Sequence, residues 1–191
     1  MSHAFLQDAR FWRFLVELDE DLAVEVRRAG CRHCGAVLHG ARYPRKPRGV
    51  RRQLLGEAYE RRLSFCCARE GCRRRATPPS VRFLGRRVYL SAVVVLVTAL
   101  GQGLTGKRRA RLRNEFGLSD RTFKRWRRWW HEVFPATPLW RGERARFVPP
   151  PHRSQLPGSL WERFEAANPA QRLAALLRFL APISTRSEHA G

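Results

Sequence analysis

Two pairs of cysteines restrict the fold of this chain more than any other feature. Cys31 and Cys34 form a Cys-x-x-Cys-Gly sequence, and Cys67 and Cys72 follow with four residues between them. A tight turn can bring both sulfurs of such a pair to one side, so that two pairs complete a tetrahedral site for one zinc ion. The expected ligands of one structural Zn²⁺ are Cys31, Cys34, Cys67 and Cys72.

The fifth cysteine, Cys66, is an alternative to Cys67 as the third ligand. The spacing from Cys67 to Cys72 is typical of finger turns and favours Cys67. The alternatives to a metal site are free buried cysteines or a redox-active Cys-x-x-Cys pair. Four thiolates would close the coordination shell and would not require His33 or His39, so the ion should build structure and catalyse nothing. We expect no catalytic residues and no enzymatic activity.

The charge of the chain predicts a polyanionic partner. Lys and Arg number 38 against 16 Asp and Glu, which gives a formal net charge of +22. Such a surface repels itself unless a polyanion screens it. Nearly all the cations are arginine, whose guanidinium suits bidentate contacts to phosphate and guanine. We therefore expect nucleic acid, in the first place double-stranded DNA, as the partner.

The pattern of residues predicts an α+β, mostly helical fold. Apolar residues recur at helical spacing from about residue 8 to residue 29, short segments broken by Gly and Pro follow, and three helical stretches come next. The expected parts are an N-terminal helical segment (1–30), a small four-cysteine zinc ribbon (31–88), a three-helix helix-turn-helix unit (89–134), a Pro-rich linker (135–159), C-terminal amphipathic helices (160–183) and a tail (184–191).

The helix-turn-helix candidate has its expected helices at 89–100, 107–116 and 120–133. Gly117 can end the second helix and Ser119 can cap the third. Residues 107–130 hold ten cations and two acids, interleaved with apolar residues, and the second helix of such a unit enters the major groove. Arg121 and Arg125 lie four apart and are expected to contact bases. The predicted nucleic-acid contacts are Lys107, Arg108, Arg109, Arg121, Thr122, Lys124, Arg125 and Arg128.

Two more basic clusters are expected to extend the phosphate track. The first covers residues 42–52, and the second consists of residues 73–75 with Arg82, Arg86 and Arg87. Both lie within the expected zinc ribbon.

The order of these parts is similar to that of a known group of proteins. An acidic N-terminal helix, a Cys-x-x-Cys-Gly pair, a second cysteine pair and a helix-turn-helix resemble the N-terminal DNA-binding region of bacterial insertion-sequence transposases with a zinc ribbon. The similarity covers roughly residues 8–134. It implies a transposon-associated or transposase-derived accessory or regulatory protein that recognises transposon ends, or a related DNA site, through Arg121, Arg125 and their neighbours.

Two departures from that family bear on activity. The second pair is Cys-x4-Cys instead of Cys-x-x-Cys, and no nuclease domain follows. Transposases of this kind need three carboxylates to hold two metal ions. The acids after Asp120 are only Glu132, Glu143, Glu162, Glu165 and Glu188.

Two other functions stay open at this point. The first is a zinc-ribbon protein that binds RNA, suggested by the Arg-rich loops and the tryptophans. The second is an adaptor in which a leucine stripe on the C-terminal helices (Leu173, Leu176, Leu177 and Leu180) docks a protein partner or a second copy. The longest apolar run, 88–100, is too short to span a bilayer, and the acidic N-terminus does not resemble a signal peptide. We therefore expect a cytoplasmic, nucleoid-associated protein without a membrane partner.

Overall fold

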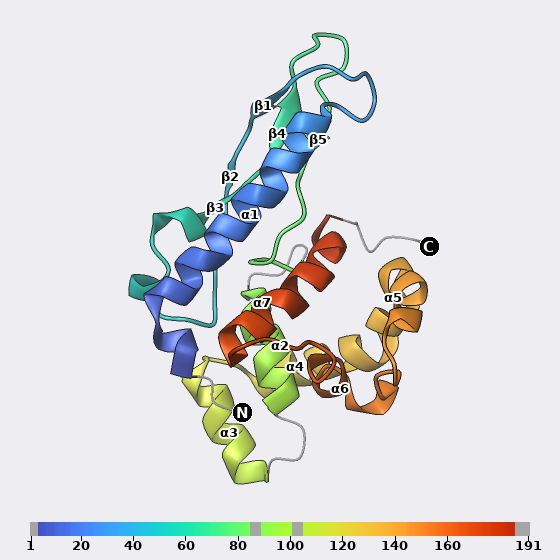
Figure 1. The fold of residues 1–191 in the computed structure, drawn as a ribbon. Coiled ribbons are helices and arrows are strands. Elements are labelled where there is room, and N and C mark those ends of the chain that lie inside the picture. The colour runs from blue at the N-terminus through green and yellow to red at the C-terminus, as the bar shows by residue number, and fades with distance from the viewer. Residues whose placement is uncertain (1–3, 85–88, 101–104, 186–191) are drawn as a thin grey trace.

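A helical body carries a narrow finger that projects from one end, as Figure 1 shows for the computed structural model. The structure describes residues 4–84, 89–100 and 105–185, without the side chains of Arg52, Arg108, Arg109 and Leu112. We define the finger as residues 23–44 and 61–76, and the body as the other described residues. Each has its own cluster of buried apolar side chains. The fold is α+β and mainly helical, as expected.

The long helix α1 (Ala9–Ala29) joins the two parts. Asp8 caps its first turn by accepting a hydrogen bond from the backbone N–H of Arg10 at 2.9 Å. The first half of α1 buries Trp12 and Leu15 in the body, and the second half buries Ala23 in the finger. The sequence pattern allowed one or two short helices here, and the structure has a single helix of 21 residues.

Short antiparallel strands build the rest of the finger. β1 (Leu38–Gly40), β4 (Phe65–Cys67) and β5 (Arg75–Ala76) form a sheet in the order β1-β4-β5, and β2 (Tyr43–Pro44) pairs with β3 (Arg61–Arg62). The register places Leu38 opposite Cys67 and His39 opposite Cys66. Because side chains alternate along a strand, Cys66 and Cys67 point to opposite faces of this sheet.

The centre of the body is α2 (Ser91–Leu100), in which every residue from Ser91 to Ala99 is buried. It packs against α4 (Asp120–Arg128), α6 (Gly158–Trp161) and α7 (Pro169–Leu180). α3 (Gly106–Glu115) precedes α4, and one π-helical turn (Trp129–Val133) follows it. In the described part of the chain, no helix combines the length and the apolar character needed to cross a bilayer.

The segment 135–159, predicted to be a linker, is instead part of the body. It contains α5 (Pro138–Glu143), and Trp140 and Leu156 lie in the main apolar cluster. Pro135 and Pro138 stand in the first turns of short helices, where proline is tolerated, and the chain stays packed on the core. The linker prediction was therefore wrong.

The leucine stripe of α7 lies inside the same core. The exposed fraction is at most 1% for all four side chains, which are Leu173, Leu176, Leu177 and Leu180. This stripe packs α7 onto the body and is not available to a partner, so the expectation that it could dock one is corrected.

A buried ion pair fixes α1 where the finger leaves the body. Asp19 accepts hydrogen bonds from Arg82 Nε at 2.7 Å, from Ser80 Oγ at 2.6 Å and from the backbone N–H of Val81 at 2.7 Å. Arg82 and Asp19 are 1% and 0% exposed. Arg82 was predicted to extend the surface that contacts phosphates. That prediction was wrong, because its guanidinium is enclosed. Arg86 and Arg87 lie outside the described residues.

Candidate functional site

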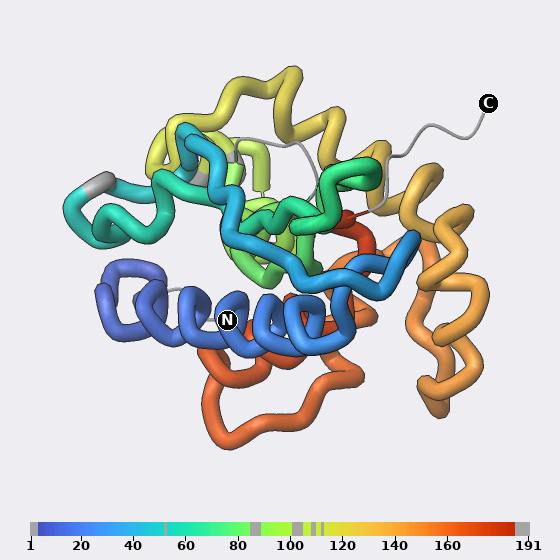
Figure 2. The backbone as a smooth tube through the Cα atoms, turned by 90° about the horizontal axis from the view of Figure 1, so that it is seen from above, coloured from blue at the N-terminus to red at the C-terminus, as the bar shows by residue number. Residues whose placement is uncertain are grey.

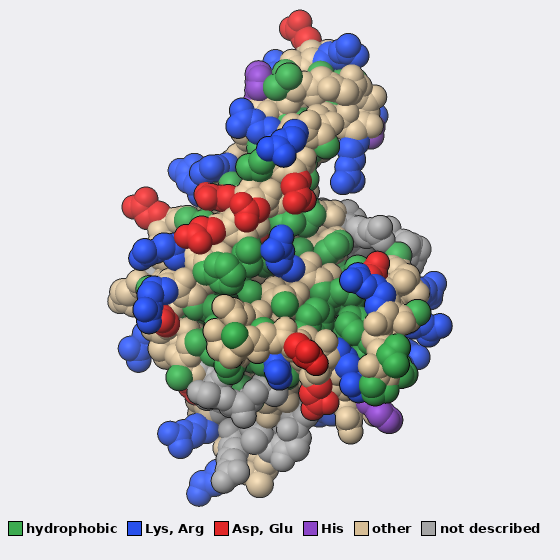
Figure 3. All heavy atoms as spheres, in the orientation of Figure 1, with side chains coloured by type: hydrophobic (Ala, Val, Ile, Leu, Met, Phe, Trp, Pro, Cys, Tyr) green, Lys and Arg blue, Asp and Glu red, His purple; other side chains and the backbone are tan. Residues whose placement is uncertain are grey.

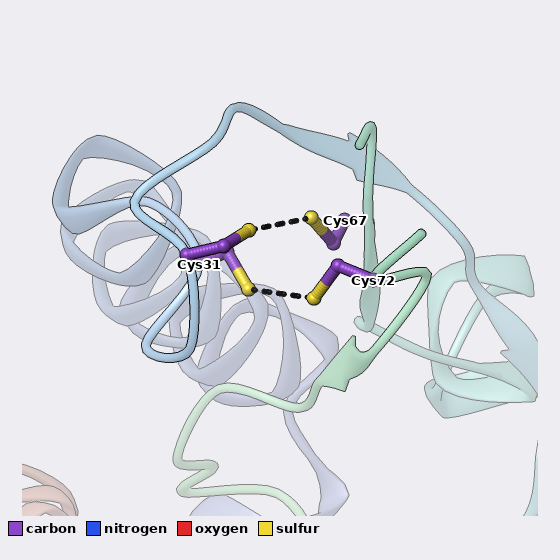
Figure 4. A group of neighbouring side chains, drawn as sticks. Cys31, Cys67 and Cys72 are labelled. Carbon is purple, nitrogen blue, oxygen red and sulfur yellow. Dashed lines mark hydrogen bonds between the residues drawn. The ribbon is translucent and has the colours of Figure 1, made fainter. Parts of the chain in front are cut away.

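Four cysteine sulfurs meet in the finger (Figure 4). The Sγ atoms of Cys31, Cys34, Cys67 and Cys72 all lie within 4.8 Å of one another. Cys31 Sγ is 3.8 Å from Cys72 Sγ, and Cys34 Sγ is 3.4 Å from Cys67 Sγ. A tetrahedral thiolate site with metal–sulfur bonds of about 2.3 Å separates its sulfurs by about 3.8 Å. The donor set and its spacing therefore fit one metal ion.

Backbone hydrogen bonds shape the first cysteine turn. The N–H of Gly35 donates to Cys31 O at 2.8 Å, and the N–H of Cys31 donates to Ala36 O at 2.9 Å. Gly30, which precedes the turn, has a φ of +74°, and a Cβ there would lie 2.9 Å from Gly35 O. Only glycine satisfies both conditions, so α1 ends at Gly30 and the chain turns directly into the cysteine pair.

The second cysteine pair leaves Cys66 outside the cluster. Its thiol donates to Arg73 O at 3.4 Å on the other face of β4. Cys67 is fully buried, and the N–H of Cys67 donates to Arg74 O at 2.9 Å. The spacing argument for Cys67 over Cys66 thus agrees with the structure.

The two ends of the cluster differ in acidity. The backbone N–H of His33 stabilises the thiolate of Cys31 and lowers the pKa of that thiol to about 7. Burial raises the pKa of the Cys67 thiol to about 12. A metal ion would supply the charge that allows Cys67 to ionise, because a coordinated thiol loses its proton. His33 is exposed, and its ring nitrogen Nδ1 lies 3.1 Å from Arg74 Nη1.

A tight turn joins α3 to α4. The N–H of Leu118 donates to Arg113 O at 2.8 Å, and the N–H of Gly117 donates to Asn114 O at 3.2 Å. This pair of bonds, with Gly117 at a φ of +60°, is a Schellman motif. Ser119 Oγ then accepts a hydrogen bond from the N–H of Thr122 at 3.2 Å and caps α4. Gly117 therefore ends α3 and Ser119 caps α4, as the sequence predicted.

One face of α4 is cationic and the opposite face is buried. Phe123 and Trp126 are 3% and 1% exposed, and Trp126 meets the Tyr89 ring edge-on at 5.1 Å. At helical spacing, the positions i, i+3, i+4 and i+7 share one face, which here points away from the body. The exposed cations on that face are Arg121, Lys124, Arg125 and Arg128.

The other predicted contact residues differ in availability. Lys107 is exposed, whereas Thr122 is half-buried and its hydroxyl accepts a hydrogen bond from Ser119 Oγ at 3.0 Å. Arg128 forms an ion pair with Glu132 at 2.6 Å. The side chains of Arg108 and Arg109 lie outside the described part of the chain.

The sequence analysis missed a set of arginines around the four-cysteine cluster. They lie at the end of α1 and in the two cysteine turns, and all are exposed: Arg27, Arg28, Arg32 and Arg69. They join Arg73, Arg74 and Arg75, which were expected to be basic surface. Their position next to the four cysteines in the sequence was the signal that could have identified them. In the other expected cluster, 42–52, Arg45 is half-buried over the Tyr43 and Phe83 rings.

Comparison with known proteins adds no relative. No protein-family model, curated protein or solved structure gives a significant match to the chain.

Proposed function

We propose that this chain is a zinc-stabilised protein that binds double-stranded DNA through α4. The observation that carries the proposal is the cationic face of α4, opposite the buried Phe123 and Trp126. A helix held by its apolar face, with cations at i, i+3, i+4 and i+7 on the other, has the form of a recognition helix in the major groove. Arg121 and Arg125 in its first two turns would contact bases, and Arg128 would contact phosphate.

The geometry of the turn supports this use of α4. Arg113, which is 18% exposed, forms an ion pair with Asp120 at 2.5 Å, so the acid at the start of α4 is neutralised within the protein. The Schellman motif and the Ser119 cap fix the direction in which α4 leaves the turn. A groove-binding helix needs both a fixed direction and a first turn without uncompensated negative charge.

The tryptophans favour duplex DNA over single-stranded RNA. All six (Trp12, Trp126, Trp129, Trp130, Trp140 and Trp161) are buried. Recognition of single strands relies on exposed aromatic rings on which unpaired bases stack. The tryptophans that suggested an RNA-binding protein therefore serve the core.

The zinc part of the proposal is tested by metal content. The purified protein should contain one zinc ion per chain, and Cys34→Ser should lose it, because a tetrahedral site with three thiolates binds far more weakly. Cys66→Ser is the matched control and should retain one zinc. Zinc loss in Cys66→Ser with retention in Cys67→Ser would overturn the assignment of ligands.

The DNA part is tested by selection from random pools. Zinc-loaded protein is mixed with a random duplex DNA pool and a matched RNA pool at low and near-physiological salt, and the bound fraction is sequenced. We expect one duplex motif to be enriched and to survive the higher salt. The resemblance to insertion-sequence proteins makes transposon ends the first defined DNA to test.

Substitutions then assign the contacts. Arg121→Ala and Arg125→Ala should each weaken binding to the selected motif by about 1–3 kcal/mol and relax its sequence at one position. Arg141→Ala, which removes an exposed arginine of α5, is the control and should leave the motif unchanged. Equal binding to all duplexes, or a preference for RNA, would contradict the proposal.

A further inference from the structure

The tip of the finger carries a dense basic surface. Residues 27–33 and 69–75 contain seven arginines and one acid, Glu70. All seven arginines are exposed: Arg27, Arg28, Arg32, Arg69, Arg73, Arg74 and Arg75. We call this surface the arginine tip. On the face seen in Figure 3, several Lys and Arg side chains lie along the finger and near its end.

The arginine tip is displayed on a stiff support. Its loops surround the four cysteines, whose sulfurs lie within 4.8 Å of one another. The support is α1, which is anchored in the body by Trp12 and by the buried ion pair of Asp19 with Arg82. The tip is therefore held at a fixed place relative to α4 instead of moving on a flexible tail.

One residue of the tip has an unfavourable backbone conformation. Arg73 has a φ of +45°, the one non-glycine residue with positive φ in the described part of the chain. An L side chain in this region costs about 1–2 kcal/mol relative to the right-handed region, and glycine avoids that cost. An arginine at this position displays a guanidinium where glycine would fold more easily.

The tip and α4 occupy different parts of the molecule. In Figure 1 the finger rises from the body at the end opposite α3. Viewed along the finger in Figure 2, α1 lies on one side of the strands, and the chain of α3 and α4 lies on the other. The strands of the finger and the α3–α4 turn thus lie on the side away from α1.

The length of α1 is close to the repeat of a duplex. α1 has 21 residues, which at about 1.5 Å per residue span about 30 Å. One turn of B-form DNA is about 34–36 Å long. A duplex that lies against α4 and extends along the finger by the length of α1 covers about one further turn.

We propose that the arginine tip is a second DNA-contact surface, which binds the phosphates of the same duplex about one helical turn from the site contacted by α4. The inference rests on the proposed function of α4 and adds a bipartite footprint to it. Arginines at the tip contact phosphates and carry no base readout, because they project from loops and do not enter a groove on a helix. The contacts at the tip lengthen the bound DNA segment and do not change the recognised sequence motif.

The test uses duplexes that contain the selected motif and differ in length. Duplexes of about 12, 22 and 32 base pairs add about one helical turn at each step. The tip variant is Arg69→Ser/Arg73→Gly/Arg75→Thr, in which glycine suits the positive φ and threonine suits a strand. The control variant, Arg13→Ser/Arg141→Ser/Arg178→Ser, removes the same charge from exposed positions on α1, α5 and α7.

The expected results separate position from total charge. For the wild type and the control variant, lengthening the duplex from about 12 to about 22 base pairs should strengthen binding on the order of 10- to 100-fold near physiological salt. Binding of the tip variant should strengthen only by the small factor that arises because a longer duplex offers more overlapping positions for the protein. Its slope of log K against log salt on the long duplex should fall by about 0.9 for each lost phosphate contact, or roughly 2.7 in all.

The outcomes distinguish this inference from the function on which it rests. The second contact would be overturned if the tip variant keeps one zinc per chain and its affinity still rises with duplex length as that of the wild type does. Recognition of DNA by α4 would then stand. Failure of Arg121→Ala to weaken binding to the shortest duplex would instead contradict the proposed function. Arg73→Gly alone should preserve zinc content and thermal stability, which excludes misfolding as the cause of weaker binding.

Discussion

Asp19 is a buried acid held by one ion pair and by hydrogen bonds from uncharged groups. It is the one acid with a buried side chain in the described part of the chain, and it accepts three hydrogen bonds from residues 80–82. Its charge also acts on Arg62, a second buried guanidinium, whose pKa is lowered chiefly by burial and raised back in part by Asp19. One carboxylate therefore compensates charge on two enclosed arginines.

Replacing Asp19 should destabilise the protein strongly. Asp19→Asn leaves the Arg82 guanidinium buried without a counter-charge, and breaking such a pair from one side costs about 3–5 kcal/mol. Urea unfolding monitored by tryptophan fluorescence would measure the change in free energy of unfolding. The exposed neighbour Glu20→Gln is the control and should change it by less than about 0.5 kcal/mol. An Asp19→Asn protein as stable as the wild type would show that the ion pair contributes no net stability.

At the scale of elements, the α3–α4 turn offers the second prediction. Ser119→Ala removes the cap of α4 and should cost about 1 kcal/mol of stability. The same variant should weaken DNA binding by more than its loss of stability explains, since α4 then frays at the end that would enter the groove. Thr137→Ala, which removes the corresponding cap of α5, should lower stability to a similar extent without affecting DNA binding. Equal effects on binding would place the interface elsewhere.

The cysteine turns give a prediction about pH. Metal binding needs thiolates, and the cluster holds protons at neutral pH, since the pKa of Cys67 is raised to about 12 and that of Cys31 is about 7. Zinc binding therefore releases protons, and affinity rises with pH. Between about pH 6 and pH 8 the apparent affinity should rise by more than about tenfold per pH unit. Competition with a chromophoric chelator would measure it. A pH-independent affinity would mean that the ligands are ionised before the metal binds.

Elements set by local sequence were predictable, and those set by distant contacts were not. Capping residues and spacing predicted the helices near 107–116 and 120–133 and the place of Cys67 in the cysteine cluster. Arg82 was misread as a surface cation, because its partner Asp19 lies 63 residues away and no local pattern links them. The segment 135–159 was misread as a linker, because its prolines are conspicuous and the burial of Leu156 depends on the whole core.

At the scale of the whole molecule, the described residues form two apolar clusters of unequal size. The finger cluster contains Cys31 and Cys67 among only six buried apolar residues, whereas the body has its own extensive core. A cluster this small would depend on a metal bound by the four cysteines for its stability. The finger should therefore unfold when the metal is removed, and the body should stay folded.

Chelation followed by limited trypsin digestion would test this division. Loss of zinc should expose the arginines of residues 69–75 to rapid cleavage, while the α2–α7 core resists. The zinc-loaded protein should be cut much more slowly in this segment. Simultaneous digestion of finger and body would show that the two parts unfold as one cooperative unit.

The acids of α1 have a consequence for how the molecule approaches a polyanion. Four exposed acids lie on one side of this helix (Glu17, Glu20, Asp21 and Glu25), and Figure 3 shows a group of acidic side chains at the base of the finger. The side of α3 and α4 lies away from that helix (Figure 2). The charge of the protein is thus unevenly distributed, with acids on α1 and cations on the exposed face of α4. In the field of a duplex, a torque turns α1 outward before contact, so a larger share of encounters begins in the binding orientation.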